Sequence, residues 1–430
     1  MAWFFTRLIY RMALPWLLFL ALPAWIIKML KRGGIRTPLG ERATIYQTDI
    51  SFEPCSAVHL HAVSVGEAML ALKLIRKWKV LEPTQAFVIA TGTSTGYQVA
   101  HDAMLDDVRV TYAPLDLPSM VARYLKRFEP SQIVLVEGEA WPNLLDQCQR
   151  NQIPVSLINA RMSPTSARRY RRFAAHLRPL FSSLDGVALQ YEEDREIWQS
   201  LGVPDAGIFH AGSLKIDPGI STDQEVVPEF ESMLEAIGGS RPRVLLASSH
   251  AGEEAWVASA IIEATCHALP IIVPRHAERR AEVIKALQTT GLNPVLRSHF
   301  HFTNDSEKSC LIVDSTGELR DWILLADVVI IGKSFFAIGG QNPCEAIVAK
   351  RPIIFGPHME NFQPLAQKLL DCGGALLARD ASELVTAIHT CLDLHQATQM
   401  TARASQWIAP HQGAAERIIH WLKKKGDPRR

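Results

Sequence analysis

A serine and a glutamate stand three residues apart in the stretch 61–70, HAVSVGEAML, between an apolar run and an amphipathic one. The spacing of Ser64 and Glu67 is typical of a capping box, in which each side chain bonds the backbone N–H of the other residue at a helix start. A carboxylate at that place could also act as a general base, because the positive end of the helix dipole keeps it ionised at neutral pH. The pattern therefore predicts a helix cap and leaves catalysis by Glu67 as a second interpretation.

A second group of polar residues follows apolar runs late in the chain. Arg275 and His276 come directly after ALPIIVP, where a guanidinium suits a phosphate because it can bond two oxygens at once. Gly339 and Gly340 precede NPCEAIV, where a helix start would offer N–H donors to a phosphate and Glu345 an acceptor to ribose hydroxyls. These residues predict a nucleotide-binding site. A surface ion pair at Arg275 and an ordinary turn at the glycines are the alternatives.

The elements that would position these residues alternate between two patterns. Short β-branched apolar runs such as AVHLHAV and AFVIATGT are each followed by a segment of helical period, which is typical of parallel βαβ units. The alternation stops from Asp217 to Arg243, a stretch rich in Pro, Gly, Ser and acidic residues that we interpret as an interdomain linker, and resumes at RVLLASS. The sequence predicts an α/β protein of two doubly wound halves facing each other across a ligand-binding cleft.

The N-terminus differs from the rest of the chain. Met12 to Ile27 carries no charge, and it is flanked by Arg7 and Arg11 on one side and by a heavier basic cluster on the other. The run is slightly short for a membrane-spanning helix, and no signal-peptide cleavage site follows it. We expect a retained membrane anchor, spanning or lying shallowly, that leaves the body of the protein on the cytoplasmic side. A buried core helix is the alternative.

Composition narrows the class of protein. The 45 basic and 44 acidic residues give a formal charge of +1, which does not indicate a nucleic-acid-binding surface. The seven cysteines form no C-x-x-C pair, which argues against a disulfide framework or a structural zinc site and fits a reducing compartment. Two basic stretches, NARMSPTSARRYRRF and the C-terminal AAERIIHWLKKKG, are either solvated helix faces or contacts to anionic lipid.

Nine motifs, taken in order, resemble those of the 3-deoxy-D-manno-octulosonic acid (Kdo) transferases of lipopolysaccharide synthesis. They are HAVSVGE, VEGEAWPN, NARMS, GSLKID, ASSHAGEE, PRHAERR, TGEL, GGQNPCEA and FGPHMENF. The resemblance implies a GT-B glycosyltransferase with two Rossmann-like domains, at the cytoplasmic face of the inner membrane, with no bound metal or cofactor. It implies transfer of Kdo from CMP-Kdo to a lipid A precursor (lipid IVA) with inversion. Another GT-B transferase of the lipid A pathway and a non-catalytic lipid A binder are the alternatives.

The resemblance also implies a role for particular residues. Glu67 would be the general base, and Glu137 and Lys215 would support the transition state. The CMP-binding segments would contain Arg275, His276, Thr316, Gly317, Glu318, Asn342, Pro343, Cys344 and Glu345. Three positions depart from the family pattern: Gly138 replaces a usual Thr, Gln341 a usual His, and Lys333 a common Gly.

Four segments are predicted along the chain. Residues 1–33 form the membrane anchor and 34–218 a Rossmann-like acceptor domain. Residues 219–410 form a Rossmann-like CMP-Kdo-binding domain, and 411–430 a C-terminal helix with a basic tail.

Overall fold

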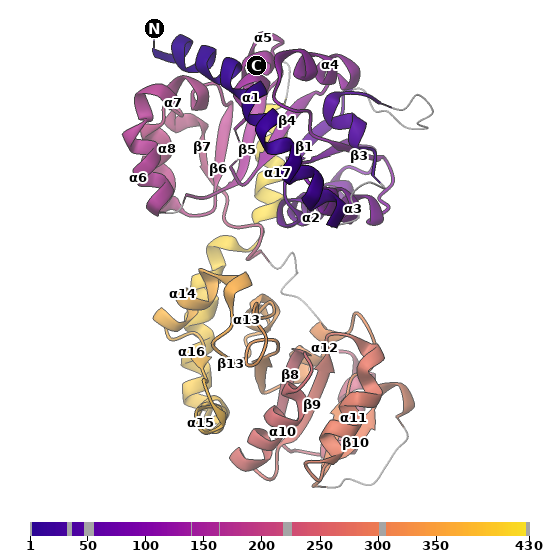
Figure 1. Cartoon of the computed structure of the whole chain (residues 1–430). Helices are drawn as coiled ribbons and strands as arrows, with labels where there is room; N and C mark the ends of the chain where they lie inside the picture. The colour runs from indigo at the N-terminus through magenta and orange to yellow at the C-terminus, as the bar shows by residue number, and fades with distance from the viewer. Residues whose placement is uncertain are drawn as a thin grey trace. The chain divides into compact units, whose positions relative to one another are not determined.

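A computed structural model describes residues 2–31, 37–46, 56–138, 140–162, 164–217, 226–300 and 307–426. The chain divides into two compact units, shown in Figure 1. The N-terminal unit comprises Met1–Asp217 together with Pro410–Arg430, and the C-terminal unit comprises Pro218–Ala409. The segment predicted as a separate C-terminal piece, 411–430, therefore belongs to the N-terminal unit.

The N-terminal unit contains a seven-stranded sheet in the order β3-β2-β1-β4-β5-β6-β7, in which every pairing is parallel. Its strands are β1 (Val58–Ala62), β2 (Phe87–Thr91), β3 (Val108–Tyr112), β4 (Gln132–Val136), β5 (Val155–Ala160), β6 (Gly186–Leu189) and β7 (Ile208–His210). Its helices are α1 (Ala2–Lys31), α2 (Val65–Leu81), α3 (Ser94–Asp102), α4 (Pro118–Phe128), α5 (Pro142–Arg150), α6 (Pro164–Arg172), α7 (Ala174–Phe181), α8 (Arg195–Ser200) and α17 (Ala414–Lys425). Helices α2, α3 and α17 cover one face of the sheet, and α4, α5, α7 and α8 cover the other.

The C-terminal unit repeats this plan, with a parallel seven-stranded sheet in the order β10-β11-β9-β8-β12-β13-β14. Its strands are β8 (Arg243–Ser249), β9 (Leu269–Pro274), β10 (Asn293–Leu296), β11 (Ser309–Ile312), β12 (Val328–Ile331), β13 (Ile353–Phe355) and β14 (Leu376–Leu377). Its helices are α9 (Pro228–Gly238), α10 (Glu253–Ala264), α11 (Arg280–Gln288), α12 (Leu319–Leu325), α13 (Cys344–Val348), α14 (Leu365–Asp371), α15 (Ala381–Leu392) and α16 (Leu394–Ile408). Helices α10, α11 and α15 pack their apolar side chains on one face.

The α/β prediction is confirmed by these two sheets. Strands β1, β2, β4 and β5 are buried at every position, as expected for parallel strands that are covered by helices on both faces. Strands β1 and β2 lie within AVHLHAV and AFVIATGT, two of the apolar runs that predicted strands.

The predicted interdomain linker, Asp217 to Arg243, is wrong over its second half. Helix α9 occupies Pro228–Gly238 and buries Phe230, Met233, Leu234 and Ile237 within the C-terminal unit. The Phe230 ring stacks on Trp322 of α12 at 4.4 Å between centroids. The buried positions follow the i, i+3, i+4, i+7 spacing of an amphipathic helix, which the Pro, Gly and acidic composition of the segment obscured.

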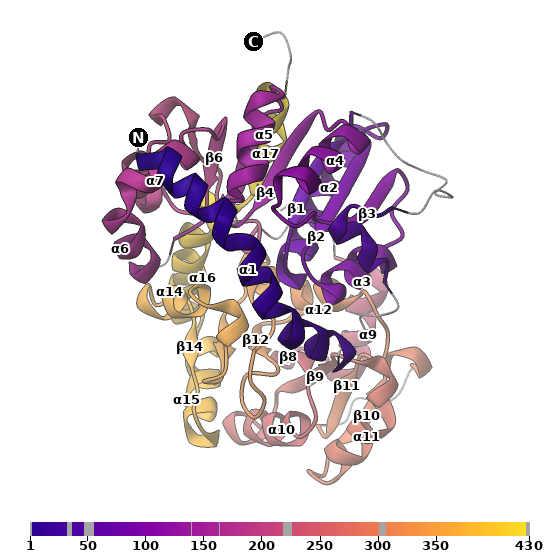
Figure 2. The same ribbon diagram turned by 45° about the horizontal axis from the view of Figure 1, so that its top comes forward.

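Helix α1, whose course Figure 2 shows, is bound to the N-terminal unit through residues near its start. Its Tyr10 hydroxyl donates to Asp116 at 2.9 Å, and its Arg11 guanidinium donates to Asn143 at 2.8 Å. Its other side is apolar and open to solvent: Ile9, Met12, Trp16, Leu17, Phe19 and Leu20 are each at least 60% exposed. The alternative of a buried core helix is therefore wrong for these residues. Among the described residues, no helix is both long and apolar enough to cross a membrane.

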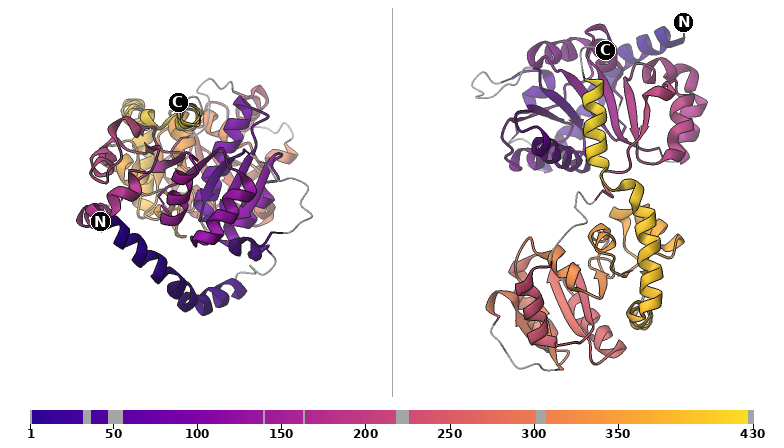
Figure 3. Two further views of the ribbon diagram at one scale, coloured as in Figure 1. Left: turned by 90° about the horizontal axis from the view of Figure 1, so that it is seen from above. Right: turned by 180° about the vertical axis from the view of Figure 1, so that it is seen from behind.

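Helix α17 lies against the sheet of the N-terminal unit, as Figure 3 shows in yellow. Its start is capped by Asp217, whose carboxylate accepts from the backbone of Gly413 and Ala415 at 3.1 and 2.9 Å. Near its end, Lys423 pairs with Glu82, and Lys425 donates to the backbone of Asp185. The basic end of this helix is thus partly bound to the unit's own surface.

One buried histidine predicts how stability depends on pH. Burial lowers the pKa of His61 to about 4, and neither ring nitrogen has a hydrogen-bond partner among the described residues. An unfolded chain protonates this ring near pH 6.5, so stability falls as the pH drops below that value. Replacing His61 by Leu removes this loss, so the variant should gain about 2 kcal/mol relative to wild type between pH 7.5 and pH 5 in chemical denaturation. The exposed-residue control His389→Leu should show no such gain, and an equal effect of His61→Leu at both pH values would contradict the expectation.

Candidate active site

Glu67 lies where β1 ends and α2 begins, and both of its carboxylate oxygens are engaged. The Ser64 hydroxyl donates to Oε1 at 2.8 Å, and the Val63 backbone N–H donates to Oε2 at 2.7 Å. The Glu67 N–H in turn donates to the Ser64 hydroxyl at 3.3 Å. The predicted cap by Ser64 is therefore confirmed, whereas the Glu67 carboxylate bonds the N–H of Val63, one residue before the position that a capping box predicts. The side chain is largely buried, with the residue 8% exposed, so the cap also fixes the direction in which the carboxylate points.

Glu137 and Lys215 form an ion pair at the same edge of the sheet. Lys215 Nζ lies 2.8 Å from Glu137 Oε1, and their side chains are 43% and 22% exposed. Glu137 directly follows β4, and Lys215 comes five residues after the end of β7. The structure thus brings together two residues that are far apart in sequence. It leaves the ammonium open enough to contact an anionic ligand.

Glu67 and the ion pair follow neighbouring strands. Strand β1 pairs with β4, and His61 is opposite Leu135. Val63, which holds the Glu67 carboxylate, and Glu137 therefore each come two residues beyond this matched pair. Because the strands are parallel, their carboxyl ends meet at one edge, which is where α/β proteins bind ligands.

The nucleotide-site residues lie at the corresponding edge of the second sheet. Arg275 and His276 follow β9 and are exposed, and the Arg275 N–H donates to the carbonyl of Ser249 at 3.0 Å. The His276 ring lies 6.3 Å from the ring of His250, which follows β8. Burial lowers the pKa of His250, and the nearby Lys333 and Arg279 charges lower it further. The loops that carry His250 and Arg275 are thus joined through the backbone of Ser249 and Arg275.

The segment Thr316–Glu318 connects β11 to α12. Gly317 has φ 89°, and nothing lies within 4 Å of where its Cβ would be, so this turn is open. The Glu318 carboxylate is held by the Ser315 hydroxyl at 2.6 Å and by the Trp322 indole at 3.3 Å. It also lies 3.4 Å from the Arg297 guanidinium. Glu318 is therefore committed to the protein's own side chains.

The second of the two glycines before α13 packs closely on the chain itself. A Cβ on Gly340 would lie 2.4 Å from the Met359 sulfur and 3.0 Å from the His358 carbonyl, which gives this glycine a structural reason. Helix α13 is one short turn, and its Cys344 N–H already donates to the Asn342 side chain at 3.0 Å. Pro343 and Cys344 are buried.

Glu345 remains a candidate for polar recognition. Burial raises its pKa, while the Arg320 and Arg275 charges lower it. Glu345 therefore lies in one charged cluster with Arg320 and with Arg275, the residue predicted to bind a phosphate. The structure thus brings Arg275 and Glu345 into one region from opposite sides of β8.

A buried carboxylate that the sequence did not single out organises this edge. Glu253, at the start of α10, is fully buried and accepts four backbone N–H groups. They belong to His250, Lys333, Ser334 and Phe335, at 2.8 to 3.3 Å. It lies in the motif ASSHAGEE, so the motif was the available signal, but its role depends on β12, some 80 residues later.

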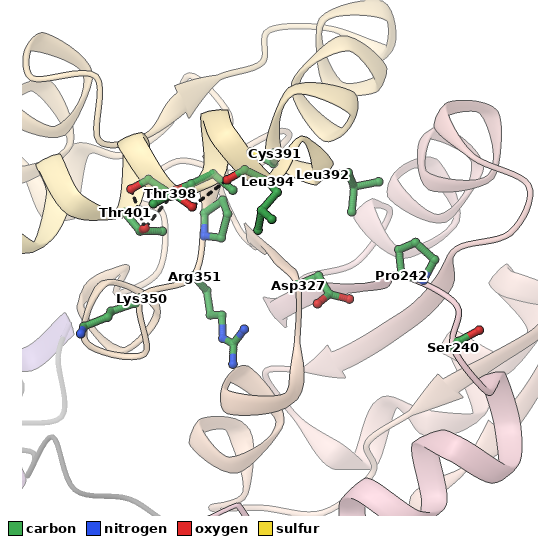
Figure 4. Close-up of a pocket in the computed structure, with 12 residues that line it drawn as sticks. Ser240, Pro242, Asp327, Lys350, Arg351, Cys391, Leu392, Leu394, Thr398 and Thr401 are labelled. Carbon is green, nitrogen blue, oxygen red and sulfur yellow. Dashed lines mark hydrogen bonds between the residues drawn. The ribbon is translucent and has the colours of Figure 1, made fainter.

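Other hollows and clusters do not coincide with these residues. A cavity of about 370 Å³ lies where β8, β12 and β13 begin, lined by Pro242, Asp327 and Arg351 among others (Figure 4). This is the amino-terminal edge of the sheet, opposite to the predicted nucleotide site. Among the described residues, no three His, Cys, Asp or Glu side chains converge to hold a metal.

Comparisons with known proteins agree with the motifs. Residues 37–218 match the profile of a family described as 3-deoxy-D-manno-octulosonic-acid transferase (kdotransferase). A 3-deoxy-D-manno-octulosonic acid transferase of Bordetella pertussis is 32% identical over 376 residues, which cover 85% of this chain and 86% of that protein. One of Haemophilus influenzae is 29% identical over 393 residues, which cover 90% and 91%.

Two solved structures share the architecture. MurG from Acinetobacter baumannii has a TM-score of 0.53 at 13% identity, covering 86% of this chain and 100% of its own. A putative UDP-N-acetylglucosamine 2-epimerase from Listeria monocytogenes has a TM-score of 0.51 at 14% identity, covering 86% and 96%. With the two parallel sheets, they establish a GT-B fold.

The contacts of Glu253 predict a large effect of a small change. Glu253→Gln replaces one accepting oxygen by a donor that faces backbone N–H groups, so we expect a loss of about 2 to 3 kcal/mol in the unfolding free energy. Glu263→Gln, on the exposed side of the same helix, should change it by less than about 0.5 kcal/mol. Chemical denaturation of both variants measures the difference, and equal effects would contradict the assigned role.

Proposed function

The chain belongs to the 3-deoxy-D-manno-octulosonic acid transferase family, and from this premise we propose that it transfers Kdo from CMP-Kdo to a hydroxyl of a lipid A precursor such as lipid IVA. The observation that carries the proposal is the Glu67 carboxylate, held at the carboxyl edge of a parallel sheet by Ser64 and Val63. The relatives from Bordetella pertussis and Haemophilus influenzae support the transferred sugar.

The proposed reaction is an inverting displacement. The acceptor oxygen forms a bond to the anomeric carbon of Kdo, and the bond from that carbon to the CMP phosphate oxygen breaks, so that CMP leaves as an anion. Glu67 takes the proton of the acceptor hydroxyl as its oxygen becomes a nucleophile. Oε1 accepts one hydrogen bond, from the Ser64 hydroxyl, and so keeps a lone pair for this proton, while the Val63 N–H holds the carboxylate in place.

Charged residues of both units are suited to bind the anionic donor CMP-Kdo. Kdo carries a carboxylate and CMP a phosphate, so binding requires cations at two places. Lys215 is partly exposed beside Glu137 and is suited to the sugar or to charge that develops in the transition state. Arg275 is exposed after β9 and suits the phosphate, and Glu345 suits the ribose hydroxyls.

Helix α1 supports a place for the enzyme at the inner membrane, on its cytoplasmic face. Its Arg7, Tyr10 and Arg11 side chains are bound to the N-terminal unit, and its exposed side is apolar and carries Trp16 and Phe19. Helix α6 adds Arg168, Arg169, Arg171 and Arg172, which suit anionic head groups. The described cysteines are free thiols, consistent with a reducing compartment.

The contacts of α1 and of the residue Thr37 with the N-terminal unit favour a helix that lies in the membrane plane over one that spans the bilayer. Arg7 and Arg11 pair with Asp146, and Thr37 shares a hydrogen bond of 2.7 Å with Tyr112 of the same unit. From Arg11 to Lys31 the helix rises about 30 Å. The six residues from Lys31 to Thr37 reach at most about 20 Å. A helix crossing the bilayer would put Lys31 on the far side, too distant for Thr37 to return to Tyr112.

The role of Glu67 as general base can be tested by one substitution. Glu67→Gln keeps an oxygen for the cap but accepts no proton, so Kdo transfer should fall by about 10² to 10⁴. The assay incubates detergent-solubilised protein with CMP-Kdo and lipid IVA and counts Kdo mass increments on the lipid by mass spectrometry. The matched control is Glu383→Gln at the start of α15. There Asp380 accepts the Glu383 N–H as Ser64 accepts that of Glu67, and Glu383 accepts the Arg379 N–H as Glu67 accepts that of Val63.

The outcomes separate the alternatives. A Kdo increment that Glu67→Gln loses and Glu383→Gln retains supports both the activity and the base. No increment from a folded wild type contradicts Kdo transfer and favours another GT-B transferase of the lipid A pathway or a non-catalytic lipid A binder. Equal losses of Kdo transfer in both variants would indicate that Glu67 acts only as a helix cap.

The in-plane arrangement of α1 can be tested by its depth in anionic vesicles. A fluorescent probe at Met12 and one at Leu20 should report the same shallow depth when lipid-bound quenchers are placed at graded depths. A spanning helix would separate these positions by about 12 Å in depth and would contradict the in-plane arrangement. A probe at Met104, which is 85% exposed in the same unit, shows whether quenching is specific to α1.

A further inference from the structure

Asn159 stands between Glu137 and the loop that carries Lys215. Its side-chain amide donates to Glu137 Oε1 at 3.1 Å, and its side-chain carbonyl accepts the N–H of Leu214, the residue before Lys215, at 2.9 Å. The residue is fully buried. One carboxamide thus links both members of the ion pair, one through its side chain and the other through its backbone.

The backbone at Asn159 is shaped to aim this side chain. The register of β5 against β6 shifts between Leu157 and Ala160, and Asn159 has φ 53°. Positive φ is uncommon for any residue but glycine, although Asn is among the few that tolerate it. A bulge of this kind redirects a side chain at the end of a strand. Glu137, with φ 69°, is in the same left-handed region.

The surrounding contacts keep the link in one orientation. Gln190 donates to the Asn159 carbonyl at 2.7 Å and accepts from the Ser213 hydroxyl at 3.1 Å. On the other side of the Leu214 peptide, Lys73 of α2 donates to its carbonyl at 2.7 Å. The side-chain oxygen of Asn159 must face the Leu214 N–H, so the amide nitrogen is directed at Glu137.

We propose that Asn159 is a positioning residue that keeps the Glu137 carboxylate joined to the Lys215 loop during transfer. The inference rests on the proposed role of Glu137 and Lys215. It adds a residue to which no role is assigned by the motifs, although NARMS contains it. The Asn159 amide donates to the same Glu137 oxygen that pairs with the Lys215 ammonium, so it fixes the place at which the two charges meet.

The substitution Asn159→Asp tests this by changing charge with little change of shape. It keeps an oxygen for the Leu214 N–H but places a second carboxylate against Glu137, so the two share a proton to higher pH. We expect the acidic limb of the kcat profile to move up by about one pH unit or more. The KM for CMP-Kdo should change far less than kcat.

A matched control separates charge from packing. Ser213→Ala removes one hydrogen bond of the same network, to Gln190, without contact to Glu137. It should leave the pH profile of kcat unshifted. If Asn159→Asp also leaves the acidic limb where it is in wild type, the proposal is overturned.

A second readout does not depend on activity. The free energy of unfolding of Asn159→Asp should fall relative to wild type as the pH rises above about 4, because the unfolded chain then releases both protons while the two carboxylates repel each other in the folded one. The swap Asn159→Asp with Glu137→Gln restores one carboxylate and one amide and should abolish that pH dependence. A swap that keeps it refutes the Asn159–Glu137 link, whereas a wild type without Kdo transfer refutes the proposed function alone.

Discussion

Both sheets are parallel throughout, and the rest of the structure depends on this constraint. Parallel strands point their carboxyl ends to one edge, so the loops after β1, β4, β5 and β7 meet in one place although the sequence separates them. Because helices cover both faces of the strands, polar side chains that reach solvent or a ligand lie at the ends of the strands. The carboxyl edge therefore gathers Glu67, Glu137 and Lys215 in one unit, and Arg275 and Glu345 in the other.

Buried carboxylates stabilise these edges by accepting backbone N–H groups. Glu253 joins α10 to the loop after β12, and Asp217 caps α17. Asp116 caps α5 through Asn143 and Leu144 and also accepts the Tyr10 hydroxyl of α1. Burial raises the pKa of Asp116 to about 6, and these hydrogen bonds oppose that rise. In each case the negative charge lies against the positive end of a helix, so one side chain connects distant segments.

Backbone strain also occurs at these carboxyl edges. Glu137, Asn159, Ser248 and Lys333 all have positive φ between 53° and 69°, and each lies within two residues of the end of its strand, β4, β5, β8 and β12 respectively. Such conformations cost about 1 to 3 kcal/mol each and persist where the surroundings impose them. Lys333, one of the departures from the family pattern, is held through its N–H by Glu253 and through its carbonyl by Gly340. Its cation is thus retained at a position where glycine would be less strained.

The sequence by itself determined the α/β class, the helix cap at Ser64 and Glu67, and the family, because apolar period and short motifs are local properties of the chain. The linker prediction for residues 228–238 is wrong, because the Pro, Gly and acidic composition of this segment obscures the four apolar positions that α9 buries. Only the tertiary structure decided that α1 is bound by Tyr10 and Arg11, that Gly340 packs on Met359, and that Asn159 joins Glu137 to Leu214. Each of these contacts joins residues from elements separated in the sequence, and their partners are set by how strands and helices pack, which no local pattern encodes.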